Sequence, residues 1–234
     1  MSQRNFHRVF LTCVAALSFF SVSKSSVLSS GNSPIDEKST STEEQPVSIR
    51  PGDTAPDWQK LPGTDDELHS LSDLKDHDVV VICFTSNTCP YSTDYEARMN
   101  ELQSLFDSQG RRAILVAVNS NDHPGDSLDR MRERVQQQDL KYLYLRDESQ
   151  QVAKSFGAIY TPEFFVLNKE RQVVYRGAMD DNTDAAKVQL KYVAIAVEAA
   201  MDGGQPEVAE APARGCQIRY RKERRNSRRR NSGS

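Results

Sequence analysis

The segment VVVICFTSNTCP, residues 79–90, decides how this chain of 234 residues folds. It begins with an uninterrupted apolar run and then passes through small polar residues to Cys89 and Pro90. A continuous apolar run that ends in turn residues indicates a strand buried on both faces of a sheet. A proline directly after Cys89 suits the first turn of a helix. We therefore expect Cys89 at the junction between a buried strand and the N-terminus of a helix.

This position predicts a reactive thiol at Cys89. The free N–H groups and the positive end of the helix dipole stabilise a thiolate at a helix N-terminus, so the pKa of Cys89 should lie below that of a free thiol. The thiolate is the form that attacks disulfides and peroxides. The alternative is that Cys89 is one more small buried apolar residue. The agreement of strand, turn, cysteine and proline favours the reactive thiol.

The segments on either side of this junction alternate between strand and helix patterns. Apolar residues recur at helical spacing from Tyr91 to Phe106, and this helix should end near Gly110. Further strands are predicted over residues 113–118, 142–145, 164–167 and 173–175, and further helices over residues 127–138, 147–156 and 188–199. Alternating strands and helices before a closing hairpin predict an α/β fold, with a mixed central sheet covered by helices on both faces.

The turn resembles the active-site turn of thioredoxin-fold redox proteins. More narrowly, it is similar to the turn F-x-C-N-x-C-P-Y of extracytoplasmic redoxin and peroxiredoxin-like thiol-disulfide oxidoreductases. The matching residues are Phe84, Asn87, Cys89, Pro90 and Tyr91. Residues 52–58, GDTAPDW, resemble the entry to redoxin domains. The resemblance implies a thioredoxin-like three-layer sandwich. Ser86 replaces the first cysteine of the usual pair, so a dithiol within the turn is impossible.

A second part of the expected site is Thr161-Pro162, just before the strand predicted at residues 164–167. The resemblance implies that Pro162 is cis and faces Cys89, and that Thr161 offers its backbone to an extended substrate chain. Together with Asn87 and Thr88 of the turn, these residues are the expected substrate-binding set. The alternative is an ordinary trans proline at the start of a strand.

The resemblance leaves the reaction open between three possibilities. Peroxiredoxins carry an arginine near the position of Pro162, and a threonine where this chain has Ser86, whose hydroxyl group offers similar chemistry. Arg98 or Arg176 could supply the missing charge, although a surface role is the simpler expectation for both. The possibilities are thiol-disulfide exchange, one-cysteine hydroperoxide reduction, and a binding module that has lost catalysis.

The remaining cysteines differ in what their surroundings predict. Cys83 lies within the apolar run and is expected to be an inert buried residue. Cys216 begins the segment CQIRY after Gly215, which resembles the ending G-C-x-I-[KR]-[WY] of the same redoxin-like group. The resemblance makes Cys216 the candidate to resolve a mixed disulfide or a sulfenic acid on Cys89, with flexible flanks that allow its approach. A free tail thiol or an intermolecular link is the alternative.

The two ends of the chain predict export and a flexible tail. Residues 1–26 combine Arg4 and Arg8 with an apolar run over residues 9–20, which fits a secretory signal. This run of twelve residues falls short of the roughly 20 that span a bilayer, so no stable span is expected after cleavage. An uncleaved anchor is the alternative. We expect a disordered spacer over residues 27–49, the domain over residues 50–205, and a flexible tail over residues 206–234, in a periplasmic or secreted protein.

Charge and composition limit the classes of partner and cofactor that we expect. Residues 219–230 form a basic arm, which in some proteins binds nucleic acid. A solubilising role is preferred here, because an exported protein rarely meets nucleic acid. The histidines lack metal-ligand spacing, and the chain has no phosphate-binding glycine loop. We therefore expect no metal and no cofactor. The expected partners are a thiol reductant or a disulfide-bearing protein, with a hydroperoxide as the alternative substrate.

Overall fold

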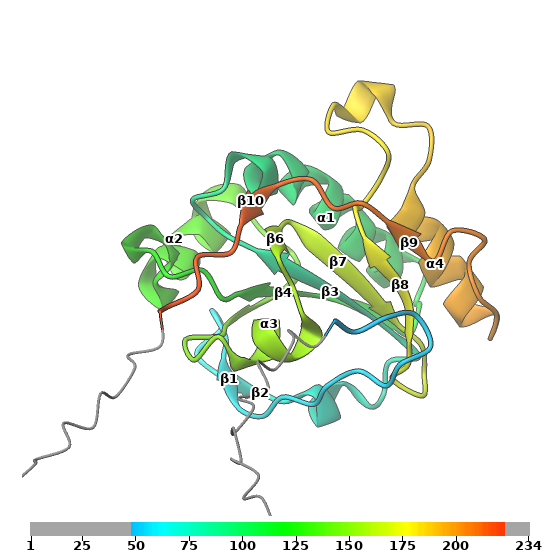
Figure 1. Cartoon of the computed structure of the whole chain (residues 1–234), viewed down its shortest axis with the longest axis horizontal. Coiled ribbons are helices and arrows are strands. Elements are labelled where there is room, and N and C mark those ends of the chain that lie inside the picture. The colour runs from blue at the N-terminus through cyan, green and yellow to red at the C-terminus, as the bar shows by residue number, and fades with distance from the viewer. Residues whose placement is uncertain (1–47, 223–234) are drawn as a thin grey trace, which may run out of the picture. The chain divides into compact units, whose positions relative to one another are not determined.

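The computed structural model describes residues 48–222, so the expected signal, most of the spacer and the end of the basic arm lie outside the described residues. A six-stranded sheet forms the centre of the domain, in the order β5-β4-β3-β7-β8-β9 (Figure 1). Its strands are β3 (Val79–Thr85), β4 (Ala113–Asn119), β5 (Leu143–Arg146), β7 (Glu163–Leu167), β8 (Val173–Gly177) and β9 (Glu210–Ala211). The β3–β4, β4–β5 and β8–β9 pairs are parallel, whereas β3–β7 and β7–β8 are antiparallel. The predicted mixed sheet is confirmed.

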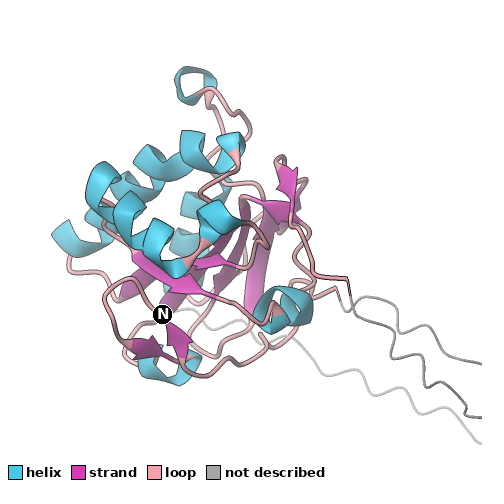
Figure 2. Ribbon diagram, turned by 90° about the vertical axis from the view of Figure 1, so that its left-hand side faces the viewer, coloured by secondary structure: helices cyan, strands magenta, loops and turns pink. Residues whose placement is uncertain are grey.

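Helices cover both faces of this sheet (Figure 2). They are α1 (Pro90–Ser108), α2 (Leu128–Gln138), α3 (Gln151–Phe156) and α4 (Tyr192–Met201), with short 3-10 turns η1 (Leu71–Leu74), η2 (Pro124–Asp126) and η3 (Ala185–Lys187). Buried residues of α1, α2 and α4 pack on one face. Buried residues of α3 and η1 pack on the other face, together with Trp58. None of the helices within residues 48–222 is long and apolar enough to cross a membrane.

Strand β3 forms the centre of both layers of the core. All of its residues are buried, as the apolar run predicts. Successive side chains of a strand point to opposite faces, so Val81 and Cys83 join the layer under α1 while Ile82 and Phe84 join the layer with α3. The Phe84 ring contacts Phe156 of α3 and Phe165 of β7, so the end of β3 just before the turn is packed into the core.

Two helix starts differ from the sequence prediction. Helix α3 begins at Gln151 rather than near Asp147, because the Asp147 carboxylate accepts hydrogen bonds from Ser120 and from the Ala153 N–H across the intervening turn. Helix α4 begins at Tyr192 rather than near Val188. The chain before α4 instead makes a loop that carries η3 and closes through a hydrogen bond from the Asp181 N–H to the Leu190 carbonyl oxygen.

The segment after α4 returns to the sheet instead of leaving it as a flexible tail. Strand β9 pairs with β8, and strand β10 (Cys216–Gln217) pairs with β6 (Tyr160–Thr161), so the segment crosses one end of the domain (Figure 1). Ile218 is buried in the same layer as α3, and Tyr220 packs beside it. This apolar burial explains why residues 210–222 are held on the domain.

Candidate functional site

Cys89 is the N-cap residue of α1, four residues after β3 ends at Thr85, as the sequence predicts. Pro90 is the first residue of the helix. The turn is closed by a hydrogen bond from the Cys89 N–H to the Ser86 carbonyl oxygen. The Cys89 side chain is only 2% exposed, so a substrate cannot reach its sulfur without contacting the residues that cover it.

The Thr161–Pro162 segment lies directly against this thiol. The peptide bond between the two residues is cis, as expected. The Cys89 thiol donates a hydrogen bond to the Thr161 carbonyl oxygen at 2.9 Å. Turn and cis-proline segment therefore meet at Cys89, although they are separated by more than seventy residues of sequence.

Cys216 completes a group of two thiols. It stands opposite Thr161 in the antiparallel pairing of β10 with β6, and the two thiols are close enough for each to affect the pKa of the other. Both cysteines are free thiols, and Cys216 is the more exposed of the two. Cys83 is fully buried in β3, and its burial raises the pKa of its thiol well above the usual range. Of the described cysteines, Cys89 and Cys216 thus form the pair suited to exchange.

The surroundings of Cys89 favour its thiolate. Burial opposes the charge, but it is outweighed by hydrogen bonds from the Cys216 thiol, the Thr161 side chain, and the N–H groups of Ser92 and Cys216. The pKa of Cys89 therefore lies below that of an ordinary thiol. Burial and the neighbouring Cys89 sulfur raise the pKa of Cys216 to about 11. The pair thus has one thiol prepared to attack and one that holds its proton.

A buried carboxylate holds the turn from below. Asp126 is fully buried, and it accepts hydrogen bonds from Ser86 Oγ (3.0 Å), Thr88 Oγ1 (2.7 Å) and the Asn87 N–H (2.6 Å). Asn119 and Asn121 donate to the same carboxylate. Burial raises the pKa of Asp126, but these donors outweigh it and bring the pKa below the usual value. Ser86 is therefore fixed in place by a buried anion.

The side chains of Asn87 and Thr88, which the sequence suggested as substrate-binding, face into this network. Asn87 donates to the Gly125 carbonyl oxygen and accepts a hydrogen bond from the Tyr144 hydroxyl group. Thr88 donates to Asp126, as described above. Both side chains therefore support the shape of the turn, and their N–H groups are engaged as well, that of Asn87 with Asp126 and that of Thr88 with Ser86 Oγ.

Asp126 and the residues around it were not predicted from the sequence as part of the site. Asn119, Asn121 and Asp126 lie between the strand predicted at residues 113–118 and the helix predicted at residues 127–138, and no role was expected for them. A signal was present, because β3 and β4 are parallel and polar residues follow the carboxyl end of each strand. Ends of neighbouring parallel strands meet at one edge of a sheet, where ligand and catalytic groups gather in α/β folds.

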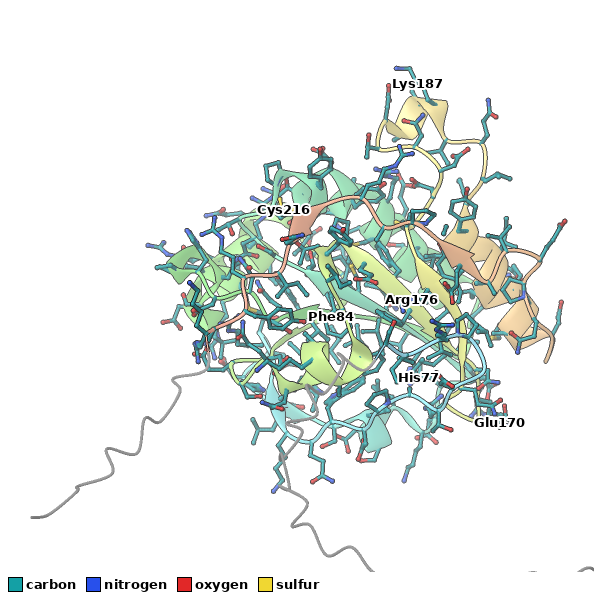
Figure 3. The ribbon with its side chains drawn as sticks, in the orientation of Figure 1. His77, Phe84, Glu170, Arg176, Lys187 and Cys216 are labelled. Atoms are coloured by element: carbon teal, nitrogen blue, oxygen red, sulfur yellow. The ribbon has the colours of Figure 1, made fainter. Side chains whose placement is uncertain are left out.

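The two arginines considered as activating charges have other partners. Arg98 pairs with Asp180, lies over the Tyr95 ring and donates to the Thr183 carbonyl oxygen. Arg176 pairs with Glu163 at 3.0 Å and lies away from Cys216 (Figure 3). Each guanidinium group therefore organises a loop or a sheet edge, and neither is the surface cation of the simpler expectation, because the Arg98 and Arg176 side chains are only 12% and 15% exposed.

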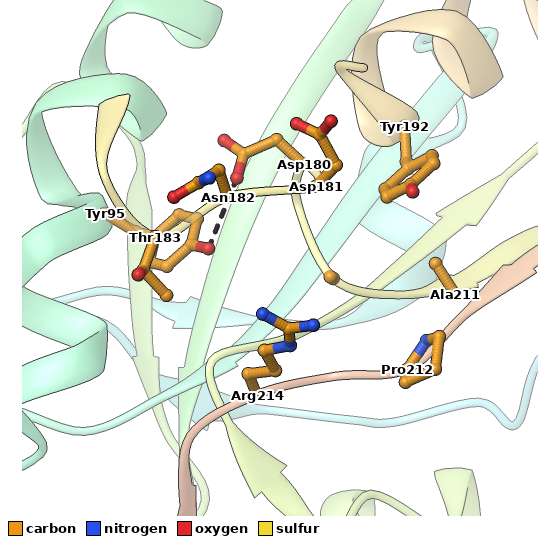
Figure 4. Close-up of a pocket in the computed structure, with 10 residues that line it drawn as sticks. Tyr95, Asp180, Asp181, Asn182, Thr183, Tyr192, Ala211, Pro212 and Arg214 are labelled. Carbon is orange, nitrogen blue, oxygen red and sulfur yellow. Dashed lines mark hydrogen bonds between the residues drawn. The ribbon is translucent and has the colours of Figure 1, made fainter. Parts of the chain in front are cut away.

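Two hollows and one acidic group lie outside the thiol pair. A cavity of about 80 Å³ is lined by residues of α1, the 180–183 loop and the tail, including Tyr95, Asp180, Pro212 and Arg214 (Figure 4). A larger groove of about 450 Å³ runs between α1, α4 and the η3 loop. Asp65, Glu67 and His69 could place one ligand atom each within 4.8 Å of one another on the β1 (Leu61–Pro62) and β2 (Leu68–His69) hairpin. Cys89 lines neither hollow.

Comparison with protein families assigns the chain that carries this site to a family. The model of the redoxin family matches residues 50–192. The chain belongs to the redoxin family. As a redoxin with a free thiol at the strand–helix junction, it is a thiol-dependent oxidoreductase with a thioredoxin-like fold. The matched residues include Cys89 and Pro162 and end before Cys216, so the family match does not cover the thiol contributed by the tail.

Solved structures extend the comparison over more of this redoxin. A hypothetical protein of Sinorhizobium meliloti is 32% identical, with a TM-score of 0.68 over 75% of this chain and 97% of its own. An uncharacterised conserved protein of Geobacillus kaustophilus is 28% identical, with a TM-score of 0.68 over 74% of this chain and 93% of its own. A protein described as a thioredoxin, from Neisseria meningitidis, is 19% identical, with a TM-score of 0.51 over 66% of this chain and 91% of its own. No curated protein matches the sequence.

Proposed function

We propose that this redoxin exchanges disulfides through Cys89 and resolves the adduct with Cys216. The observation that carries the proposal is the pairing of β10 with β6, since it places Cys216 opposite Thr161, whose carbonyl oxygen accepts the hydrogen bond of the Cys89 thiol. The lowered pKa of Cys89 and the raised pKa of Cys216 support a division of roles, in which Cys89 attacks first.

The first step forms a mixed disulfide. The Cys89 thiolate attacks one sulfur of a partner's disulfide, and the other sulfur leaves as a thiolate and takes up a proton from water. Cys89 then carries no negative charge. Because the hydrogen bond to Cys89 and its charge contribute to the raised pKa of Cys216, their loss favours the Cys216 thiolate when that thiolate is needed.

The second step closes an internal disulfide. Cys216 attacks the Cys89 sulfur and expels the partner's second thiol, so the partner gains two electrons and the Cys89–Cys216 pair loses two. A thiol reductant restores the pair by the same exchange in reverse. The partners are thus a disulfide-bearing protein and a thiol reductant, and the direction of flow depends on which of them is in excess.

A hydroperoxide is the second candidate substrate, and the burial of the Cys89 sulfur favours it because a small oxidant needs less space than a protein. Cys89 would attack the terminal oxygen, release an alcohol or water, and become a sulfenic acid. Cys216 would condense with that acid, release water and form the same disulfide. The two candidates differ in the oxidant and share the product.

We also propose that the protein acts outside the cytoplasm. The apolar run at residues 9–20, with basic residues before it and no acidic residue, supports this proposal, and an oxidising compartment suits a thiol pair that cycles through a disulfide. Mass determination of the protein purified from its native cells tests it. A mature N-terminus near residue 26 is expected, and a cytoplasmic chain with the segment intact would contradict it.

Thiol-labelling mass spectrometry of the full chain tests the exchange. Addition of one equivalent of a small disulfide or of hydrogen peroxide should remove Cys89 and Cys216 from labelling together and yield a peptide that links them. Cys83→Ala serves as the matched control and should leave the link unchanged. A Cys89 that labels no faster than a model thiol at pH 7 would favour the binding-module interpretation.

A further inference from the structure

The tail of this protein binds the domain as an added strand. Strand β10 pairs antiparallel with β6, with Cys216 opposite Thr161 and Gln217 opposite Tyr160. The Ile218 N–H donates to the Ile159 carbonyl oxygen at 2.9 Å, and Thr161 Oγ1 donates to the Cys216 carbonyl oxygen at 3.3 Å. The edge beside Cys89 therefore accepts an extended chain and holds a cysteine of that chain against the Cys89 sulfur.

The close approach of the tail requires a glycine before this cysteine. A Cβ atom at Gly215 would lie 2.0 Å from the Thr161 carbonyl oxygen and 2.6 Å from the Thr161 carbonyl carbon. Real Cβ atoms do not come this near to backbone, so any other residue at this position would push the strand away. The edge thus selects glycine followed by cysteine, in extended conformation.

The contacts that hold the tail on the domain are concentrated after Cys216. Ile218 is buried, and the Tyr220 hydroxyl group donates to the Ala158 carbonyl oxygen at 2.7 Å. The Arg219 N–H donates to Asn121 Oδ1 at 2.8 Å, and Arg221 pairs with Asp122 and Glu148. Residues 212–215, just before Cys216, belong to no strand. Strand β10 is therefore held by the buried Ile218, by the polar contacts of the residues that follow it, and by the close approach at Gly215.

We propose that β10 is a displaceable strand, and that the β6 edge takes in its place an extended segment of a partner protein in which a glycine precedes a cysteine. The inference rests on the proposed function of Cys89. Main-chain hydrogen bonds would supply affinity, as in other cases of strand addition, and the Gly215 position would supply selectivity. The partner's cysteine then occupies the place of Cys216 and receives the attack of Cys89.

Strand exchange also couples resolution to release. Cys216 and the partner's cysteine cannot occupy the same place, so the mixed disulfide persists while the partner strand is bound. When β10 returns, it removes the partner strand from the edge and brings the Cys216 thiol to the Cys89 sulfur. The resulting disulfide leaves the partner reduced and unbound, with the electron balance given above.

The test uses two synthetic peptides and full-length protein. One peptide has the sequence of residues 213–222, with its cysteine in a disulfide to a coloured aryl thiol, and the other differs only by Gly215→Ala. Attack by Cys89 joins the peptide to the protein and releases the aryl thiolate. Cys216→Ser protein, whose tail remains docked, is compared with Cys216→Ser/Ile218→Ala and Cys216→Ser/Gly215→Ala proteins, in which the tail is loosened at different points.

With the tail docked, both peptides should react slowly and at similar rates. With the tail loosened by either change, the glycine peptide should react about tenfold faster than the alanine peptide. Addition of Gly204→Ala to the Cys216→Ser protein is the matched control, because a Cβ atom there meets only ordinary contacts, and its rates should equal those of the docked protein. Circular dichroism and trypsin cleavage after Arg214 verify that the domain is folded and that the tail is loosened.

The outcomes separate this inference from the proposed function. Equal rates for the two peptides on both loosened proteins, or full discrimination on the docked protein, would overturn the displaceable strand. Alkylation of Cys89 by iodoacetamide is measured in the same samples. A slow Cys89 in every protein would instead contradict the proposed function, whereas a fast Cys89 without discrimination between the peptides contradicts only the strand exchange.

Discussion

The two neighbours of Cys89 are held in very different ways. The turn at residues 86–88 rests on the buried Asp126 carboxylate, with donors from four side chains and a backbone N–H. The strand of Cys216 rests on two residue pairs at a sheet edge, on the close approach at Gly215, on the buried Ile218 and on hydrogen bonds of the residues that follow it. The turn, which is held rigidly, carries the Ser86 hydroxyl group, and the strand, which we propose can move, carries the Cys216 thiol. A resolving thiol on a movable strand can leave the attacking sulfur, which a thiol within the fixed turn cannot do.

The largest expected effect comes from removal of the carboxylate under the turn. Asp126→Ala leaves buried donors of Ser86, Thr88, Asn119 and Asn121 without a partner, and should lower the free energy of unfolding by roughly 3–5 kcal/mol. Urea denaturation measures it. Asp129→Asn, at an exposed carboxylate, is the control and should change the stability by less than about 1 kcal/mol. A small loss at Asp126 would remove the contrast between a fixed turn and a movable strand.

The next effect concerns the tail thiol. In Cys216→Ser protein the mixed disulfide on Cys89 lacks its internal resolving group, so its lifetime should increase about tenfold or more. Quenched samples on non-reducing gels, with a disulfide-bearing protein as substrate, measure this lifetime. Cys83→Ser is the matched control, since its thiol is buried in β3. An unchanged lifetime would mean that an external thiol resolves the adduct.

Introducing a thiol into the turn tests the contrast directly. Ser86→Cys should form a disulfide with Cys89 under mild oxidation, because both residues lie in one tight turn, and should speed the reduction of insulin. It should also cost about 1–2 kcal/mol of stability, since the hydroxyl group that donates to Asp126 is lost. Disulfide mapping and urea denaturation report the two effects. If only Cys89–Cys216 forms, the turn is too constrained to carry a redox pair.

The smallest effect is a change in the pH profile of Cys89. The pKa of Cys89 is below the usual thiol value, so its alkylation rate should rise through a midpoint on the acidic side of a free thiol. Cys216→Ala removes a donor to the thiolate and should move this midpoint upward. Iodoacetamide alkylation from pH 5 to 9 measures the profile, with Cys83→Ala as control. A midpoint that does not move would assign the lowered pKa to the helix N-terminus and the backbone donors.

The parts of the fold that the sequence predicted are those determined by neighbours in the chain. The buried β3, the proline that begins α1 and the hairpin of β7 and β8 follow from apolar period and local turn residues. The cis bond before Pro162 was expected through family resemblance. These features depend on contacts within a few residues, or on a motif that many chains share.

The parts that the sequence did not predict depend on distant contacts. Ser86 and Asp126 are 40 residues apart, and Asn121 and Arg219 are 98 apart. The spacing of apolar residues along the sequence does not predict that a polar loop will bury its aspartate, or that a polar tail will return to a sheet edge. Ile218 was a visible apolar residue in the tail, but its partners on α3 and β3 become neighbours only in the folded chain.

Strand β9 has a consequence for the concentration at which Cys216 works. It lies on β8 at Gly177, where a side chain would collide with the Ala211 carbonyl oxygen, so the chain is tied to the domain before it reaches β10. Four residues, 212–215, connect β9 to Cys216 and span at most about 18 Å when extended. A thiol on such a short linker meets Cys89 at an effective concentration in the millimolar range. A dissolved thiol at micromolar concentration would therefore lose the competition for the mixed disulfide even when β10 has left its edge.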